Sequence, residues 1–441
     1  MTKLLIRDAC ILTMNSADEV IRGDVLIDGR TIAAVGPKLS ASADVVIDAN
    51  GKALLPGFVQ THVHLCQTLF RGQADDLALI DWLRRKIWPL EAAHDEETVY
   101  CSALLGIGEL LRSGTTTILD METVRHAGSA FRAIEESGIR AQAGKAMMDL
   151  GDGVPPALLE KTERSLQESV DLLNRWHGAA SGRIEYAFCP RFVVSCSEEL
   201  LVGVRDLAAR YRVNVHTHAS ENRDEIALVE AERGMRNVVY LDRIGLARPN
   251  LILAHSIWLD DEEKRIIRDR GVKVTHCPGS NLKLASGIAR VPELLGDGVA
   301  VGIGADGAAC NNNLDMFQEM RLTAFLQKVR RGPTAMDAKT VLRMATIGGA
   351  KVLGMESRIG SIEPGKLADL QLLDLEDYHV YPSYGADPYS RVVYAATRGD
   401  VDTVIVDGRI VVRDKTVLSV DRRKVLSESD RAIRSLLSRI G

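Results

Sequence analysis

Six of the ten histidines in this 441-residue sequence stand at the ends of short apolar runs. The first two, His62 and His64, close the run "GFVQTHVH" at alternating positions, so a strand would direct both imidazoles to one face. Later runs end in the other four histidines and in one aspartate: His216, His218, His255, His276 and Asp306. Imidazole and carboxylate groups gathered in this way are typical ligands of a divalent transition metal.

One divalent metal is the chemistry that this set predicts. Three neutral imidazoles and one carboxylate suit Zn²⁺, with Fe²⁺ as the alternative, and they leave one position for water. A metal in such a site lowers the pKa of that water toward neutrality. The roles of His216 and His276 are left open.

Hydrolysis at such a site also needs groups that move protons. Glu221 follows His218 by three residues, which suits a shuttle that takes a proton from the attacking water and delivers it to the leaving group. His255 could hydrogen-bond the attacking oxygen, and Asp306 could take a proton as well as bind metal. We therefore predict Glu221, His255 and Asp306 as the catalytic residues.

Strands that alternate with helices must bring these side chains together. Amphipathic segments such as 197–211 and 260–271 separate the apolar runs, and this alternation predicts a parallel sheet. Eight strands predict a closed (β/α)₈ TIM barrel, in which chemistry lies at the carboxyl ends of the strands. The predicted strands are 57–64, 115–121, 139–147, 184–190, 213–220, 251–256, 272–278 and 299–306.

Both chain ends have a different texture, of short strands joined by turns. Asp28-Gly29 and Asp407-Gly408 are hairpin signals in the two ends. We predict that residues 1–55 and 361–420 form one small β-sandwich, that 56–360 form the barrel, and that 421–441 form a final helix.

The bulk composition is that of a soluble globular protein. Hydrophobic residues make up 46% and charged residues 26%, and the net charge of -5 gives no general attraction to nucleic acid. No apolar run is long enough to span a bilayer, and the first residues lack the features of a signal peptide. Seven scattered cysteines argue against a disulfide framework. A cytoplasmic protein with neither a nucleic-acid nor a membrane partner is expected.

The site pattern resembles the amidohydrolase superfamily, in its mononuclear branch of aminohydrolases that act on cyclic amidines. The features that carry the resemblance are His-x-His on the first barrel strand, "HASE" on the fifth, a lone histidine on the sixth and aspartate on the eighth. The fourth strand, "YAFCPRF", has no lysine to bridge two metals, which favours one metal per subunit. The resemblance implies that the metal ligands are His62, His64, His218 and Asp306. It also implies a homo-oligomer.

Three further segments are similar to adenosine-type deaminases: 276–295, 304–322 and 360–375. The resemblance implies hydrolytic deamination of a 5'-deoxyadenosine-like nucleoside, such as 5'-deoxyadenosine or 5'-methylthioadenosine, to the inosine analogue and ammonia. S-adenosylhomocysteine and adenosine are further candidates. The segment that would bind a homocysteine carboxylate offers only Lys145, so a smaller 5'-substituent is favoured.

Five residues are expected to contact the substrate. Trp82 and Glu91 match positions that face the ribose in those enzymes, where a carboxylate can accept hydrogen bonds from both ribose hydroxyls. Arg191 in "CPRF" and Gln67 resemble guanine deaminase instead, and an arginine fork suits the O6/N7 edge of guanine. His255 would face the substrate as well.

Other functions remain as alternatives. They are a guanine or 8-oxoguanine deaminase and an s-triazine hydrolase, since triazine hydrolases also carry the glutamine found at Gln67. A scaffold without catalysis is disfavoured because every predicted metal ligand is present. The other zinc deaminase fold needs His-x-Glu and Pro-Cys-x-x-Cys, and neither motif occurs.

Overall fold

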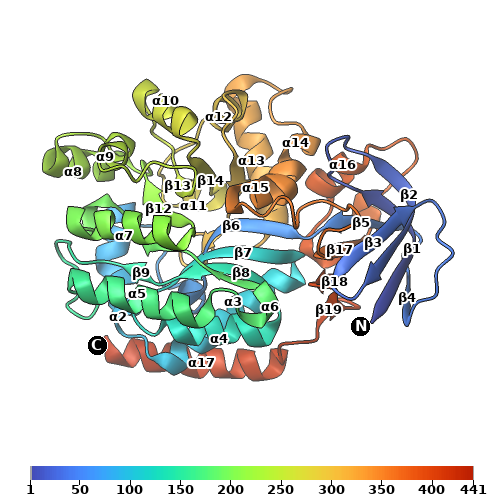
Figure 1. Cartoon of the computed structure of the whole chain (residues 1–441), viewed down its shortest axis with the longest axis horizontal. Coiled ribbons are helices and arrows are strands. Elements are labelled where there is room, and N and C mark those ends of the chain that lie inside the picture. The colour runs from blue at the N-terminus through green and yellow to red at the C-terminus, as the bar shows by residue number, and fades with distance from the viewer. Residues whose placement is uncertain (1, 441) are drawn as a thin grey trace.

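A parallel barrel forms the larger part of the molecule, to the left in Figure 1. The computed structural model describes residues 2–440. Neighbouring strands pair in parallel in the order β10-β8-β7-β6-β15-β14-β13-β12, and the bridge between Phe188 and Val215 closes the circle. The predicted (β/α)₈ barrel is therefore confirmed. Its strands are β6 (Phe58–His64), β7 (Thr115–Met121), β8 (Arg140–Gly144), β10 (Ile184–Tyr186), β12 (Val215–Ala219), β13 (Leu251–His255), β14 (Lys273–His276) and β15 (Val301–Ile303).

Helices surround the barrel, and their ends carry clear sequence signals. Helix α10 begins at a capping box made by Asp260 and Glu263 and ends at Gly271, whose φ of 66° suits glycine. The main helices are α3 (Glu96–Arg112), α4 (Ala127–Ser137), α5 (Thr162–Trp176), α7 (Glu198–Tyr211), α8 (Arg223–Arg233), α9 (Asn237–Arg243), α10 (Asp261–Arg270), α12 (Val291–Gly296), α13 (Met316–Arg331), α14 (Ala338–Arg343) and α15 (Gly349–Leu353).

Strands from both chain ends form a second, mixed sheet, to the right in Figure 1. Its main path is β20-β19-β18-β17-β5-β1-β2-β3, and β4 pairs with β1. A bulge at Asp8 bends β1, which pairs with β4 before the bulge and with β5 after it. The strands are β1 (Lys3–Leu12), β2 (Val20–Asp28), β3 (Thr31–Gly36), β4 (Val45–Asp48), β5 (Lys52–Pro56), β17 (Leu370–Asp374), β18 (Val401–Val406), β19 (Arg409–Arg413) and β20 (Thr416–Val417).

The mixed sheet has its own apolar core, with members from both chain ends such as Ile6, Leu54 and Leu372. The accessory β structure built from both ends is thus confirmed, and its strands hydrogen-bond as one continuous sheet. The exact boundaries at residues 55 and 361 stay predictions.

One close approach joins the two parts of the molecule. Gly57 connects β5 to β6, and a Cβ atom there would lie 2.1 Å from the Thr116 side chain, so only glycine fits. The last helix, α17 (Arg422–Arg439), runs beneath the barrel against α3, so the C-terminus lies far from the mixed sheet (Figure 1).

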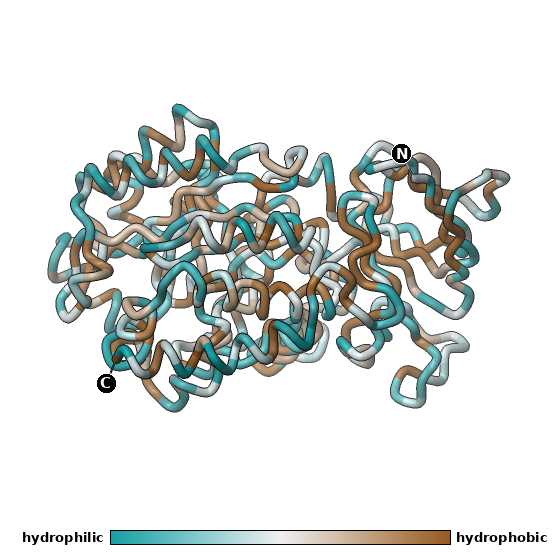
Figure 2. The backbone as a smooth tube through the Cα atoms, turned by 90° about the horizontal axis from the view of Figure 1, so that it is seen from below, coloured by the Kyte–Doolittle hydropathy of each residue, from teal (hydrophilic) through white to brown (hydrophobic). Residues whose placement is uncertain are grey.

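Hydropathy follows this architecture. In Figure 2 the tube is brown along many strands of the barrel and the mixed sheet and teal along much of the outer helices and turns. Within residues 2–440, no helix combines the length and apolar character that crossing a bilayer requires.

Candidate metal centre and active site

Four predicted ligands converge at the carboxyl end of the barrel. His62 and His64 come from the end of β6, His218 from β12, and Asp306 from β16 (Asp306–Gly307), which extends the eighth strand. The Oδ1 atom of Asp306 lies 3.3 Å from Nε2 of His62 and 3.3 Å from Nε2 of His64. Nε2 of His218 lies 3.3 Å from Nε2 of His64.

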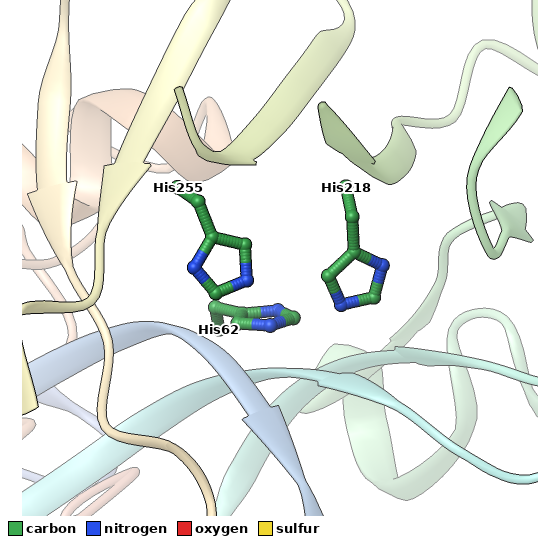
Figure 3. A group of neighbouring side chains, drawn as sticks. All are labelled: His62, His218 and His255. Atoms are coloured by element: carbon green, nitrogen blue, oxygen red, sulfur yellow. The ribbon is translucent and has the colours of Figure 1, made fainter. Parts of the chain in front are cut away.

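These separations fit a tetrahedral metal site. Ligands about 2.0–2.1 Å from a tetrahedral Zn²⁺ lie roughly 3.3–3.4 Å from one another. Nε2 of His62 is buried and has no hydrogen-bond partner among the described residues, so its lone pair is free for a cation. Figure 3 shows that His62, His218 and His255 point toward one another across the barrel mouth. The donor set therefore fits one divalent metal.

Backbone carbonyls orient two of the imidazoles. Nδ1 of His64 donates to the carbonyl of Met121 at 2.7 Å, and Nδ1 of His218 donates to the carbonyl of Arg191 at 2.7 Å. Because a carbonyl can only accept, each Nδ1 carries the proton and each Nε2 keeps its lone pair. Burial lowers the pKa of His64 to about 4 and lowers that of His218 well below its usual value, so both rings are neutral.

Asp306 is held in a geometry that few residues adopt. Its φ of 64° lies in the left-handed region. This conformation costs a residue other than glycine on the order of 1–3 kcal/mol, and residues that adopt it cluster at functional sites. The Ser280 hydroxyl donates to Oδ2 at 2.6 Å, which leaves Oδ1 toward the histidines. Two hydrogen bonds favour the ionised form of Asp306, because the Ser280 hydroxyl donates to Oδ2 and the Gly307 amide donates to Oδ1 at 2.8 Å.

Glu221 and His255 lie together beside this cluster. Nε2 of His255 is 3.4 Å from Oε2 of Glu221 and 3.8 Å from Oδ2 of Asp306. Burial raises the pKa of Glu221. Burial alone would lower the pKa of His255, but the carboxylates of Glu221 and Asp306 outweigh this effect, and the pKa of His255 is raised. Nδ1 of His255 donates to Asn281 Oδ1 at 2.8 Å, and the Ser286 hydroxyl donates to Glu221 Oε1 at 3.2 Å. The pair is therefore arranged to hold and pass a proton.

A cavity opens above these groups. Part of its wall comes from the segment after β6, which folds into α1 (Leu79–Trp82), a π-helical turn (Leu83–Ile87) and α2 (Trp88–Ala92). The apolar lining is Leu79, Trp82, Leu83, Phe192 and Leu284. The polar lining is His64, Gln67, Arg191, His218, Glu221, Glu225, His255 and Asp306.

Four of the five predicted substrate contacts line this cavity directly, namely Gln67, Trp82, Arg191 and His255, and Glu91 does not. The Glu91 side chain is 1% exposed and accepts from both terminal nitrogens of Arg191, at 2.5 and 3.0 Å. Gln67 donates to the same carboxylate at 2.9 Å. Glu91 thus lies in contact with Gln67 and Arg191, which face the cavity, and its contact with a ribose stays a prediction.

Several supporting residues have no counterpart in the sequence-based predictions. Ser280, Asn281 and Ser286 hold Asp306, His255 and Glu221 respectively, and Glu225 accepts from the Glu221 backbone. The first two lie in α11 (Pro278–Lys283). The three residues Ser280, Asn281 and Ser286 fall in the segment 276–295, which resembles deaminases. That resemblance is the only signal in the sequence that points to them.

The chain belongs to the amidohydrolase family, whose family profile matches residues 53–411. It is 43% identical over 435 residues to a 5'-deoxyadenosine deaminase of Methanobrevibacter smithii, with 98% of each chain covered. It is 41% identical over 445 residues to a 5-methylthioadenosine/S-adenosylhomocysteine deaminase of Pelotomaculum thermopropionicum, with both chains covered completely.

A solved structure agrees with these relatives. The adenosine deaminase of Xanthomonas campestris with bound zinc has a TM-score of 0.92 and 34% identity, and the match covers 99% of this chain and 98% of that one. The family, the full-length deaminase relatives and the zinc-bound neighbour together show a hydrolytic deaminase that uses a divalent metal.

Proposed function

We propose that this protein deaminates a 5'-deoxyadenosine-like nucleoside to the corresponding inosine analogue and ammonia, with Zn²⁺ as its metal. The observation that carries the proposal is the Glu221–His255 pair, 3.4 Å apart beside the predicted metal ligands and on the lining of the cavity. The names of the full-length relatives, which include 5'-deoxyadenosine deaminases, support this substrate class.

Different residues bind the metal, transfer the proton and orient the attacking oxygen. His62, His64, His218 and Asp306 would hold a divalent cation, which would supply Lewis acidity that lowers the pKa of water at the site. Glu221 takes a proton from the attacking water and returns it to the departing amine, as its raised pKa suits. His255 donates a hydrogen bond that holds the attacking oxygen, and Asn281 fixes the orientation of its ring.

The cavity wall favours a small apolar group at the 5' position. Leu79, Trp82 and Leu83 line one part of the cavity. Lys145, the cation that could have met a homocysteine carboxylate, is 0% exposed and is bound by Glu160 at 2.7 and 2.8 Å and by Glu168 at 3.0 Å. Lys145 is therefore occupied, which argues for a 5'-methyl or 5'-methylthio group over homocysteine.

Guanine is the second candidate, because Arg191 and Gln67 both line the cavity. An arginine fork could read the O6/N7 edge of guanine. In this structure, however, the fork of Arg191 is engaged by both oxygens of Glu91. This pairing favours the nucleoside, since it occupies the end-on pair of donors, one N–H on each terminal nitrogen.

A substrate panel tests the proposal. Ammonia release is measured from 5'-deoxyadenosine, 5'-methylthioadenosine, S-adenosylhomocysteine, adenosine, guanine, 8-oxoguanine and melamine. We expect the highest kcat/KM for the first two compounds. A preference for guanine by orders of magnitude would overturn the proposed substrate and leave the deaminase class intact.

The proton shuttle is tested by Glu221→Gln, which preserves shape but cannot accept a proton. We expect kcat to fall by about 10²–10⁴-fold, the usual contribution of general acid–base catalysis. The matched control is Glu232→Gln, an exposed glutamate on α8, which should turn over normally. Near-normal turnover by the Glu221 variant would remove the residue from the reaction.

A further inference from the structure

His216 lies directly behind one of the predicted metal ligands. Its Nε2 atom is 2.6 Å from Nδ1 of His62, and its Nδ1 atom is 3.2 Å from the carbonyl oxygen of Ile252 on the neighbouring strand β13. Both rings are 0% exposed. Bulk water does not reach either contact, so the direction of each hydrogen bond follows from the three groups themselves, namely His62, His216 and the Ile252 carbonyl.

The Ile252 carbonyl, at one end of this series of hydrogen bonds, determines which nitrogen of each imidazole is protonated. The Ile252 carbonyl can only accept, so Nδ1 of His216 carries a proton. In a neutral ring Nε2 of His216 then holds a lone pair and accepts from Nδ1–H of His62. His62 is left with its lone pair on Nε2, the atom that lies 3.3 Å from Asp306 and has no hydrogen-bond partner among the described residues.

The other two histidine ligands are anchored differently. His64 and His218 each donate straight to a backbone carbonyl, of Met121 and Arg191, which no side-chain substitution removes. Only His62 among the three depends on another side chain for its orientation. Because of this difference, a substitution at His216 can change the orientation of the ligand His62, although His216 is not itself a predicted ligand.

We propose that His216 is a positioning residue, which holds His62 in the tautomer and orientation that present Nε2 to the metal. The inference rests on the metal site described under the proposed function. Partners behind a metal-bound histidine fix its tautomer and ring orientation, and losing one costs about 10–100-fold in metal affinity or activity. His216 would act on the metal through His62.

The test compares His216→Leu with His216→Gln in the full-length protein. Zn²⁺ affinity is measured by competition with a chromophoric chelator, which needs no substrate. We expect the leucine variant, which has no acceptor, to bind Zn²⁺ about 10–100-fold more weakly. Glutamine can place an amide oxygen near the position of Nε2, so His216→Gln should recover a large part of that loss.

A spectroscopic signature separates positioning from mere packing. In protein labelled with ¹⁵N-histidine, the ring shifts of His62 should report protonation on Nδ1 in the parent chain and in His216→Gln. They should report a mixture of tautomers in His216→Leu. Unchanged His62 shifts and unchanged Zn²⁺ affinity in the leucine variant would overturn the proposal.

Two controls isolate the cause. His276→Leu removes another buried histidine at a barrel strand end, whose ring nitrogens have no hydrogen-bond partner in residues 2–440, and it should leave Zn²⁺ affinity unchanged. His62→Ala tests the site itself. If His62→Ala binds Zn²⁺ normally, the metal site is wrong; if it loses Zn²⁺ while both His216 variants keep it, only the role of His216 is wrong.

Discussion

Glu225 is the residue that fixes the backbone of the proton shuttle. Its Oε2 accepts from the Glu221 amide at 3.0 Å, and its Oε1 accepts from the side chain of Asn237, the first residue of α9. Both oxygens therefore act as acceptors, which suits the ionised form. Burial and repulsion from Glu221 raise the pKa of Glu225 to about 7, so the ionised form is lost just below neutral pH.

Replacing this carboxylate should displace Glu221. In Glu225→Gln one acceptor becomes an NH₂ group that faces a donor, so we expect kcat to fall roughly 10–100-fold, as small misplacements do. In the parent chain kcat/KM should fall as the pH drops through about 7, because protonated Glu225 also loses an acceptor. The variant should lose this part of the pH profile. A variant profile with the parent's acid limb would contradict the assignment.

The ligand residues could be predicted from the sequence, and their supports could not. His62 and His64 alternate at a strand end, and two-residue periodicity alone places them on one face. Asn281 lies in α11 and Ser286 in the loop after it, and the path of this segment follows from packing rather than periodicity. The pairing of Glu91 with Arg191 joins positions 100 residues apart, so no local pattern reveals it.

At the scale of elements, Lys283 connects the end of α11 to two loops. From the end of α11 its ammonium donates to Asp75 in the loop after β6, and to Asn312 and the carbonyl of Ala309 after β16. The first of these loops leads into α1, which carries Leu79 to the cavity wall. The lysine thus ties the wall-forming segment to α11 and to the segment after β16.

Removing this tie should loosen the cavity wall. We expect Lys283→Met to raise KM several-fold with a smaller change in kcat, because the wall residues contact substrate but do not move protons. Limited proteolysis should cut the 71–92 segment faster in the variant. Lys38→Met, on the exposed loop after β3, is the control. A KM equal to that of the parent would show that α11 and the two loops hold their places without the lysine.

The strand order of the barrel could be predicted because each apolar run is followed by a helix, which allows only parallel neighbours. The single continuous sheet formed by the two chain ends could not be predicted from the sequence. Its path depends on the bulge at Asp8, where β1 changes partner from β4 to β5, and nothing in the residues around Asp8 specifies which strand lies on either side.

At the scale of the whole molecule, a buried ionic cluster joins the barrel to the mixed sheet. Arg140, the first residue of β8, is 1% exposed and donates to both oxygens of Asp369, at 2.6 and 3.1 Å. It also donates to Asp407 at 3.1 Å, and the Asp407 amide donates to Asp369 at 2.7 Å. The two carboxylates lie in the mixed-sheet part, so the arginine fastens one part to the other.

Arg140→Met should separate the stabilities of these two parts. The substitution leaves two carboxylates facing each other at a buried junction, and removing one partner of a buried ion pair costs about 3–5 kcal/mol of the free energy of unfolding. The measurement is urea unfolding followed by activity and by circular dichroism. We expect a lower midpoint and two transitions that no longer coincide, with kcat unchanged before unfolding because Arg140 lies at the opposite end of β8 from the site.

Arg268→Met, which breaks an exposed pair with Asp269, should leave the midpoint unchanged. If the two variants unfold alike, the cluster contributes nothing to the union of barrel and sheet, and apolar contacts alone hold them together.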